Sequence, residues 1–568
     1  MIVTKENFAE IYPELKSRIK NALFIAIDEE MTGIFDRSNR NRKNDDPSVR
    51  YVRMIPVASR YSIIQVGITI FMHSKPQSDI AEEGMVVEDT SNEYLVFPYT
   101  FYIFPEPYCG SDVVLSPSSI DFLNKNNMDW MKWISKGIPF INAEDEISLR
   151  KKYGQEIESN DNPNVDATSA VVEPAPQQQR IVLQKAWDIE FMTKNMDGFS
   201  KMLEDPTKND FEFDKCNAFL MKYIHQTMEF DHKNVCVKKN NDGKLVATKV
   251  SEEEKAAFDI IHKQERKKAF EDAVGFRMVF NDLVECKKPI VGHNCFFDLL
   301  FLMKWLEGPL PSDMSSFVDK FNKLFPEVYD TKYIAASGIL GIKYQDTALC
   351  DIYDQLLGKG FAAAAASTGS DVTAINNALE AINSLKIVSA NGFENYKSTE
   401  SQQLHDAGYD SYCTGSVFAA EIAIANGFDN IKQNAVNKLF MMQSIYHMDI
   451  DPAAAPTFGS VKYEGVIVCI HGFAEKTTTE DLIKLACSTG LDKALIEIIW
   501  IDGSSALACL QCADTYDAII NKMNQELVKE MNVILESYPP VQKETEGSLL
   551  TKRKLDEDEA DVSTRQKV

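Results

Sequence analysis

Residues 23–31 have the sequence Leu-Phe-Ile-Ala-Ile-Asp-Glu-Glu-Met, in which an apolar run ends in acidic residues. Successive side chains of a β-strand point to opposite faces of the sheet, so Asp28 and Glu30 point the same way. Two carboxylates held side by side at the end of a buried strand repel each other unless cations lie between them. The stretch therefore predicts a buried strand whose end carries a divalent-metal site.

Two further acids occur in settings that would bring them to the same place. Residues 289–298 (PIVGHNCFFD) predict a short buried strand, a turn at a glycine, and a helix that begins close to Asn294. Asp298 would lie about one turn into this helix and face the strand end. Farther along, His405 precedes Asp410, which stands at the start of an apolar helical pattern. The candidate metal ligands are Asp28, Glu30, Asp298 and Asp410.

Four carboxylates beside a histidine suit one kind of chemistry. Carboxylate oxygens are ligands for Mg²⁺, which keeps several waters and shares the phosphate oxygens of a substrate. Two such ions about 3.5–4 Å apart can stabilise both the attacking and the leaving oxygen in phosphodiester hydrolysis. His405, with an ordinary imidazole pKa of about 6.5, can take the proton from the attacking water. Each residue alone could be a solvated charge or a helix cap, so the prediction depends on the order and apolar context of all five.

The order Asp-x-Glu, a distant Asp, then His-x-x-x-x-Asp resembles the 3′-to-5′ exonucleases of the DEDD superfamily, His subclass. Five stretches, in colinear order over roughly residues 1–535, more closely resemble the poly(A)-specific ribonucleases, or deadenylases. They are FIAIDEEMTGI (24–34), SSIDFL (118–123), IVGHNCFFD (290–298), DTK (330–332) and QLHDAGYD (403–410). The resemblance implies an enzyme with two Mg²⁺ ions per active site that degrades the poly(A) tails of mRNA and releases 5′-AMP. It also implies a homodimer, with His405 as general base.

The resemblance further implies a pocket for adenosine, because the acids contact only phosphate and sugar. The family residues that line this pocket correspond to Ile34, Ile120, Asn294 and Lys332. The chain departs from the family at two positions of the first motif, with Glu29 in place of Gly and Met31 in place of Phe. We therefore expect weaker base stacking at the 3′ end of the RNA.

The order of the predicted elements indicates an α/β protein with an RNase H-like mixed sheet as its nuclease core. Strand-like runs at residues 61–73 and 95–105 would form the antiparallel region of that sheet, and later strands would be parallel. Residues 157–180, rich in Asn, Asp, Ser, Pro and Gln, have the composition of a linker. The predicted boundaries are a first nuclease segment at 1–175, an inserted small α/β module at 176–251, a second nuclease segment at 252–455, an RRM-like domain at 456–535 and a polar, disordered tail at 536–568.

The two accessory domains each carry one informative position. In the family the insertion is an Arg-x-x-x-His nucleic-acid-binding domain; His225 matches the histidine, but Met221 stands in place of the arginine, which puts RNA binding there in doubt. In the RRM-like domain, Thr477-x-x-Glu480 predicts a helix-capping box, and the third strand lacks base-stacking aromatic residues. Trp500 matches the family's cap-binding tryptophan, and an exposed indole attracts the charged 7-methylguanosine ring. The alternative is that Trp500 is a core residue.

Composition limits the function. The net charge of −25 over 568 residues excludes a general nucleic-acid coat protein, because broad phosphate binding needs a basic face. Residues 36–60 carry six Arg and one Lys against three Asp, so this predicted loop either steers RNA towards the metals or is a solvated segment. Eleven cysteines, mostly in apolar runs, indicate reduced thiols. With the family resemblance they indicate a nuclear and cytoplasmic protein.

Two other functions stay open. The first is the same chemistry on another substrate, the trimming of the 3′ ends of small non-coding RNAs, including piRNA precursors. Enzymes that trim these RNAs tend to end in a membrane anchor, whereas this sequence has no run of about 20 apolar residues. The second is an inactive nuclease fold that serves as an RNA- or cap-binding adaptor, although the four acids and His405 are all present. In the tail, Lys552-Arg553-Lys554 is either a nuclear-import signal or solvated charge.

Overall fold

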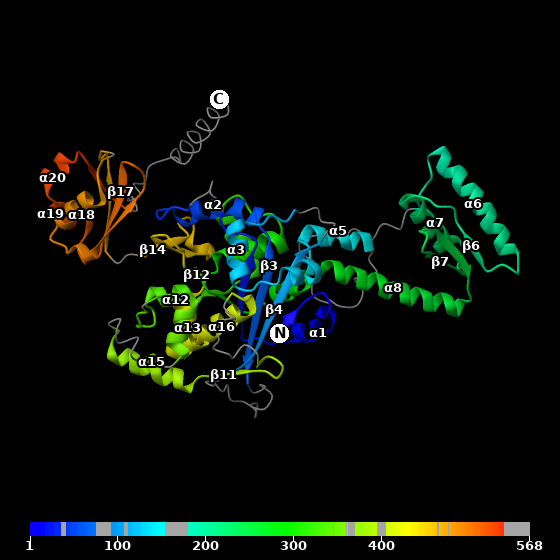
Figure 1. Ribbon diagram of the computed structural model, residues 1–568, viewed down its shortest axis with the longest axis horizontal. Helices are drawn as coiled ribbons and strands as arrows, with labels where there is room; N and C mark the ends of the chain where they lie inside the picture. Colours follow the sequence, from blue (N-terminus) through cyan, green and yellow to red (C-terminus); the bar gives the residue numbers. More distant parts are fainter. Residues whose placement is uncertain are drawn as a thin grey trace.

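The computed structural model describes residues 1–35, 41–74, 92–106, 112–153, 180–344, 346–358, 361, 370–394, 405–462, 465–474 and 476–538. A mixed sheet lies between two smaller modules, one at each end of the long axis of the molecule (Figure 1). Three segments lie outside the described residues: most of the predicted linker at 157–180, the low-complexity stretch of alanines, Ser, Thr and Gly at 362–369, and the tail with Lys552-Arg553-Lys554. Within the described regions of the chain, no helix has both the length and the apolar character needed to cross a membrane.

The central sheet has the strand order β1-β4-β3-β2-β9-β10, and β5 and β11 also pair with β4. Strands β2, β3 and β4 are antiparallel, whereas β9 and β10 run parallel to β2. This confirms the predicted mixed α/β core. The strands are β1 (Ile2–Val3), β2 (Phe24–Met31), β3 (Ile63–His73), β4 (Glu93–Pro105), β5 (Ile138–Phe140), β9 (Ile290–Gly292), β10 (Val328–Asp330) and β11 (Lys386–Ser389).

Both faces of this sheet are covered, which is why β2 and β3 are apolar along nearly their whole length. Ile25 and Ile27 point into one core, which is shared with helices α1, α2, α9, α10 and α11. Phe24 and Ala26 point into the other, shared with α12, α16 and α17. The helices of the first face are α1 (Phe8–Lys20), α2 (Pro47–Arg60), α9 (Arg277–Cys286), α10 (Phe296–Leu302), which continues as the π-helix η4 (Met303–Glu307), and α11 (Met314–Leu324). Those of the second are α12 (Thr331–Ser337), α16 (Ala407–Ile424) and α17 (Phe428–Ala435), with α13 (Leu349–Leu357) and α15 (Val372–Ser384) packed beyond α16.

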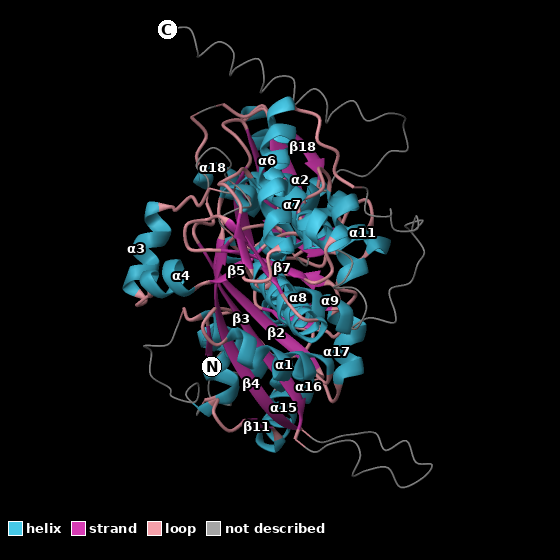
Figure 2. Ribbon diagram, turned by 90° about the vertical axis from the view of Figure 1, so that its right-hand side faces the viewer, coloured by secondary structure: helices cyan, strands magenta, loops and turns pink. Residues whose placement is uncertain are grey.

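The first nuclease segment has two helices directly before β5 in the sequence and one directly after it. They are α3 (Pro117–Lys125), α4 (Trp130–Lys136) and α5 (Ala143–Tyr153). In Figure 2, α3 and α4 stand at one side of the sheet. The backbone N–H of Ser116 donates to the carbonyl of Thr32 at 2.8 Å, which fixes the start of α3 beside the chain that follows β2.

The basic segment at residues 36–60 is only partly a loop. Its second half is helix α2, which begins at Pro47 with Asp46 as the N-cap, so the prediction of a loop is wrong there. Arg50 is buried and donates to the backbone carbonyls of Met442, Gln443 and Arg42. Its guanidinium therefore holds the fold together instead of contributing charge to an RNA-steering loop.

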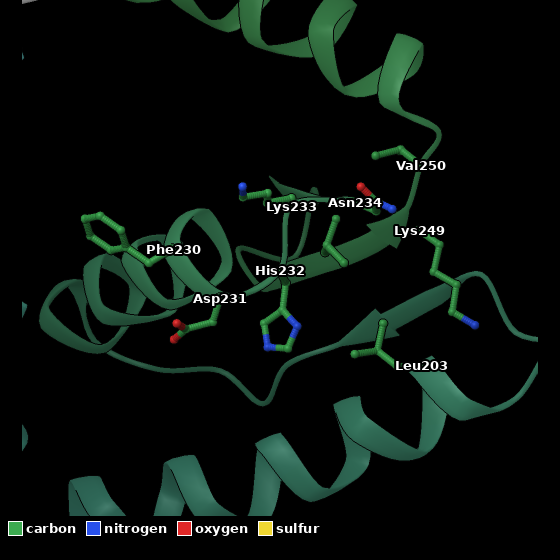
Figure 3. A pocket seen from close by; sticks show the side chains of 9 residues that line it. Leu203, Phe230, Asp231, His232, Lys233, Asn234, Lys249 and Val250 are labelled. Atoms are coloured by element: carbon green, nitrogen blue, oxygen red, sulfur yellow. The ribbon is translucent and has the colours of Figure 1, made fainter.

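The inserted module has its own sheet, in the order β6-β8-β7, and its own core around Phe199 and Phe213. Its elements are α6 (Ala186–Glu204), β6 (Asp210–Glu212), α7 (Ala218–Asp231), β7 (Val235–Lys239) and β8 (Leu245–Lys249), and α8 (Glu252–Val274) leads back to the nuclease. An open pocket of about 710 Å³ lies at the end of α7. Figure 3 shows the His232 side chain in this pocket, with Leu203 and Lys249 on the opposite side from Phe230.

A small antiparallel sheet follows α17, with the order β12 (Lys438–Leu439), β13 (Tyr446–Asp449) and β14 (Gly459–Val461), and the short helix η7 (Pro452–Ala454) lies between its last two strands. Because β14 pairs with β13, this sheet continues past the domain boundary predicted at 455. This small sheet belongs to the nuclease domain, because its first strand, β12, directly follows α17, the last helix that packs on the central sheet.

The C-terminal module is a four-stranded antiparallel sheet in the order β16-β17-β15-β18. Its elements are β15 (Val466–His471), α18 (Thr479–Cys487), η8 (Lys493–Leu495), β16 (Ile496–Trp500), β17 (Ser505–Leu510), α19 (Tyr516–Lys522), α20 (Gln525–Glu530) and β18 (Ile534–Ser537). The capping box is made by Thr478 and Asp481, one residue later than predicted. Strand β18 extends the module beyond residue 535.

Candidate active site

Strand β2 delivers two acids to one place, as its alternation requires. Asp28 and Glu30 are half-buried on one face, opposite Gly67 and Gln65 of β3, whereas Glu29 is buried on the other face. Among the described residues, neither carboxylate oxygen of Glu29 has a hydrogen-bond partner, and burial raises the pKa of Glu29 well above the ordinary value. Alternation along β2 thus places Glu29 on the side of the sheet away from Asp28 and Glu30.

Helix α16 approaches the sheet closely at its first turn. A β-carbon on Gly67 would lie 1.7 Å from the carbonyl oxygen of Ala407, and one on Gly408 would lie 2.1 Å from the hydroxyl of Thr100, so both positions require glycine. Asp406 caps the helix by accepting from the backbone of Gly408, and the Thr100 hydroxyl donates to the same carboxylate at 2.7 Å. These contacts fix the start of α16 over β3 and β4 and thereby place Asp410, in the first turn, above the end of β2.

His405 lies directly before this cap, in a left-handed backbone conformation with φ of 68°. Its backbone N–H donates to Oδ2 of Asp410 at 3.1 Å, and its ring meets the ring of Phe122 nearly edge-on, with centroids 4.6 Å apart. Burial lowers the pKa of the imidazole, which favours the neutral form near pH 7. The ring is thus held in the form that can accept a proton.

Three of the predicted site residues meet directly. Possible ligand atoms of Glu30, His405 and Asp410 all lie within 4.8 Å of one another. Asp28 and Asp298 belong to the same charged group, since the carboxylates of Asp410, Asp298 and Glu30 all raise the pKa of Asp28. The structure therefore brings together all four acids and His405 from three separate segments.

The electrostatics of this group favour a cation. Burial, and then the neighbouring carboxylates, raise the pKa values of Asp28 and Glu30 well above the ordinary range. Burial raises the pKa values of Asp298 and Asp410 to about 7. Buried carboxylates that repel one another are a suitable donor set for divalent cations, whose charge would offset the repulsion. The residues present thus fit a metal centre of this kind.

Two of the predicted adenosine-pocket residues are organised by one buried acid, Asp330, at the end of β10. Its Oδ1 accepts from the backbone N–H groups of Asn294 at 2.8 Å and Lys332 at 2.9 Å, and its Oδ2 accepts from Phe440 at 2.9 Å. Asn294 has a positive φ of 57° in the turn between β9 and α10. Its side-chain amide lies 3.9 Å from the sulfur of Met442. Asp330 therefore sets the relative positions of three segments.

The other two pocket residues lie beyond the end of β2. Ile34 is 56% exposed, and Ile120 is half-buried on α3. Met31 is buried in the core and does not present its side chain at the surface. Phe122, which is 43% exposed and contacts His405, was missed by the sequence analysis, although it lies within the quoted SSIDFL stretch. An exposed aromatic side chain therefore lies directly beside His405.

The predicted residues of the two accessory domains, Trp500 and His225, are both exposed in part and face neighbouring elements. Trp500 is 38% exposed at the end of β16, donates from Nε1 to the Thr479 hydroxyl at 3.0 Å and meets Phe473 edge-on. It is therefore neither a core residue nor a freely protruding one. In the inserted module, burial and then His262 and Arg266 of α8 lower the pKa of His225, so the signature histidine faces that helix.

An α/β sheet that gathers four acids and a histidine at one end has the architecture of a metal-dependent nuclease. The model of the CAF1 family ribonucleases matches residues 3–418, and the chain belongs to this family. The poly(A)-specific ribonuclease PARN of Xenopus laevis is 26% identical over 550 residues, which cover 92% of this chain and 78% of the relative. PARN of Homo sapiens is 25% identical over 547 residues, with the same coverage of both chains. Among solved structures, S. pombe Pop2p in its Mg²⁺- and Mn²⁺-bound form has a TM-score of 0.34 and 14% identity, covering 77% of this chain and 98% of that chain.

Proposed function

We propose that this ribonuclease is a 3′-to-5′ exoribonuclease that shortens poly(A) tails and releases 5′-AMP. The observation that carries the proposal is the meeting of Glu30, His405 and Asp410 within 4.8 Å, beside Asp28 and Asp298. Relatives named poly(A)-specific ribonuclease that align with 92% of the chain support the substrate class. These relatives align with more of the chain than the pre-piRNA 3′-exonuclease trimmer of Bombyx mori, which aligns with 74% at 25% identity, so small-RNA trimming is not favoured. The complete set of acids disfavours an inactive adaptor.

The acids would hold two Mg²⁺ ions, with Asp28, Glu30, Asp298 and Asp410 as ligands. When bound, these ions would supply the positive charge that stabilises the attacking and leaving oxygens of the phosphodiester. His405 would accept the proton of the attacking water, since its lowered pKa keeps it neutral. The hydrogen bond from its backbone to Asp410 fixes its position relative to the acids.

Base selection would depend on residues outside the acids. Asn294 and Lys332 are held together by Asp330, while Ile34, Ile120 and Phe122 lie on the side of β2 and α3. The terminal adenosine would lie between these two groups, with the amide of Asn294 as the hydrogen-bonding partner and Phe122 as the aromatic partner. Since Met31 is buried, Phe122 supplies the stacking surface that Met31 does not.

We further propose that the protein binds the 5′ cap of mRNA and forms a homodimer. The strand order β16-β17-β15-β18 supports an RRM-like domain, and the open face of the Trp500 indole would bind 7-methylguanosine. A homodimer would use the exposed apolar residues Met131 and Ile134 of α4, which are 69% and 53% exposed. We further propose a nuclear and cytoplasmic location. The ten described cysteines are all free thiols, as a reducing compartment requires.

The direct test follows product formation from RNA with a labelled 5′ end and a 3′ adenosine tail. A one-nucleotide ladder that begins at the 3′ end, with 5′-AMP as the released product, is the expected result. A matched RNA whose 3′ hydroxyl is blocked should resist, since an exonuclease needs that end. Internal fragments without a ladder would show an endonuclease and overturn the proposal.

A further inference from the structure

A positively charged cluster lies beside the predicted adenosine pocket, on the segment Phe440–Gln443 that joins β12 to β13. Asp330 ties the start of this segment to the pocket by accepting the backbone N–H of Phe440. Two residues on, the sulfur of Met442 contacts the amide of Asn294, and the Met442 side chain is 55% exposed. The segment therefore contacts Asn294 and Lys332, two of the residues predicted to bind adenosine, and we call it the pocket wall.

Three cations surround this wall. The Nζ of Lys462, just after β14, lies 3.7 Å from the centre of the Phe440 ring, and the Nζ of Lys332 lies 5.4 Å from the same centre. Arg50 approaches from α2 and donates to the carbonyls of Met442 at 2.8 Å and Gln443 at 3.2 Å. The ring faces both ammonium groups, a geometry that holds cations by attraction to its π-electrons.

The two lysines hydrogen-bond to backbone carbonyls, and nearby carboxylates act on them electrostatically: Asp330 raises the pKa of both, and Asp346 and Asp351 also raise that of Lys332. Nζ of Lys332 donates to the carbonyl of Thr347, and Nζ of Lys462 donates to the carbonyl of Met441. Among the described residues, neither ammonium forms an ion pair, although the chain has a net charge of −25. Burial, and then Arg50, lower the pKa of Lys462 to about 7, and the carboxylate of Asp330 only partly opposes this shift. Two ammonium groups against one aromatic ring, neither of them in an ion pair with a described residue, form a candidate site for an anion.

We propose that Lys462, together with Lys332, binds a backbone phosphate of the RNA next to the nucleotide in the adenosine pocket, with Phe440 holding both ammonium groups in place. The inference rests on the proposed RNA substrate and extends it to a residue outside the family motifs. A phosphate there would accept hydrogen bonds from both ammonium groups, neither of which forms an ion pair among the described residues. Since a phosphate carries no base identity, this contact would strengthen the binding of any RNA sequence and leave adenine selectivity to the other pocket residues, Ile34, Ile120 and Asn294.

The test measures RNA affinity as a function of salt in the full-length protein. Asp28→Asn serves as the background, so that bound RNA is not degraded. Each phosphate contact in single-stranded nucleic acid contributes about 0.7 to the slope of log affinity against log salt. Lys462→Gln should therefore reduce the slope by about 0.7 and weaken binding by roughly threefold to tenfold at moderate salt, equally for A-rich and U-rich RNA.

Two further variants serve as controls. Lys462→Arg keeps the charge and should retain the slope of the parent. Lys438→Gln removes a lysine of the same small sheet that lies opposite Asp449, and should leave the slope unchanged. Thermal unfolding of each variant checks that the fold is intact.

The outcomes separate this inference from the proposed function. An unchanged slope for Lys462→Gln, or an equal loss for Lys438→Gln, overturns the phosphate site while leaving the nuclease proposal untouched. A parent protein that binds no RNA at any salt concentration overturns both. A Lys462→Gln variant that loses affinity for A-rich RNA alone would contradict phosphate contact and assign Lys462 to base recognition instead.

Discussion

Replacing Asp28 by Asn should stabilise the metal-free protein and abolish hydrolysis at once. Asp28 lies beside Asp410, Asp298 and Glu30, each of which raises its pKa. Two unit charges about 5 Å apart repel by about 3 kcal/mol at an effective dielectric constant of about 20. Because neighbouring acids take up protons and thereby relieve some of this repulsion, we expect a net gain of about 1–3 kcal/mol in the free energy of unfolding.

The gain should depend on pH in a defined direction. A carboxyl group whose pKa is raised by folding binds more protons in the native state than in the unfolded state, so its effect on stability worsens as pH rises through the raised value. Asp28→Asn removes one such group. The gain should be small at about pH 5, where the acids are largely protonated, and larger at about pH 8.

Thermal unfolding in the presence of a chelator measures this effect in parent and variant at both pH values. Asp121→Asn is the matched control, since Asp121 is an exposed acid that pairs with Lys125 on α3. With Mg²⁺ present, hydrolysis by Asp28→Asn should fall by two or more orders of magnitude, because metal charge is lost in the transition state. A variant that is no more stable than the parent at the higher pH, or that keeps more than a few per cent of activity, would show that Asp28 is not a repelled metal ligand.

Three further outcomes are expected. His405→Ala should slow hydrolysis strongly near neutral pH with RNA affinity nearly unchanged, because a general base acts in the transition state; single-turnover rates and equilibrium binding check this, and a rise in KM alone would contradict it. Trp500→Ala should weaken cap-analogue binding by about tenfold to a hundredfold, as followed by fluorescence, while uncapped poly(A) is degraded normally; unchanged cap binding would remove Trp500 from the site. Adding Mg²⁺ at about pH 7 should release protons and raise the unfolding temperature, because Asp298 and Asp410 have pKa values of about 7; calorimetry in buffers of different ionisation enthalpy detects the protons, and binding without proton release would argue against these ligands.

The sequence could predict the core of the site because strand alternation is strictly local. Asp28 and Glu30 on one face of β2 follow from spacing alone, and the structure has them there. The helix that carries Asp410 was also predicted from its apolar pattern. Its close approach to the sheet, however, depends on Gly67 and Gly408, whose role becomes visible only when the two elements are packed together.

Features set by tertiary contact or by ambiguous local signals were missed. Three consecutive threonines at 477–479 leave the register of a capping box open, and the structure uses Thr478. Helix α2 was hidden by its high charge, although Asp46 before Pro47 is a helix-start signal. Phe122 could be assigned to the site only through its contact with His405, which lies far away in sequence. The cations around Phe440 likewise come from α2, α12 and the end of β14.

The most direct test of a metal-dependent, adenine-selective 3′-exoribonuclease is a time course with two otherwise identical RNAs, one ending in adenosines and one in uridines. Each RNA is incubated with the protein in Mg²⁺ and, separately, in chelator. We predict rapid shortening of the adenosine tail in Mg²⁺, clearly slower shortening of the uridine tail, and no shortening of either in chelator. Equal rates on the two tails, or hydrolysis that persists without divalent metal, would contradict the account.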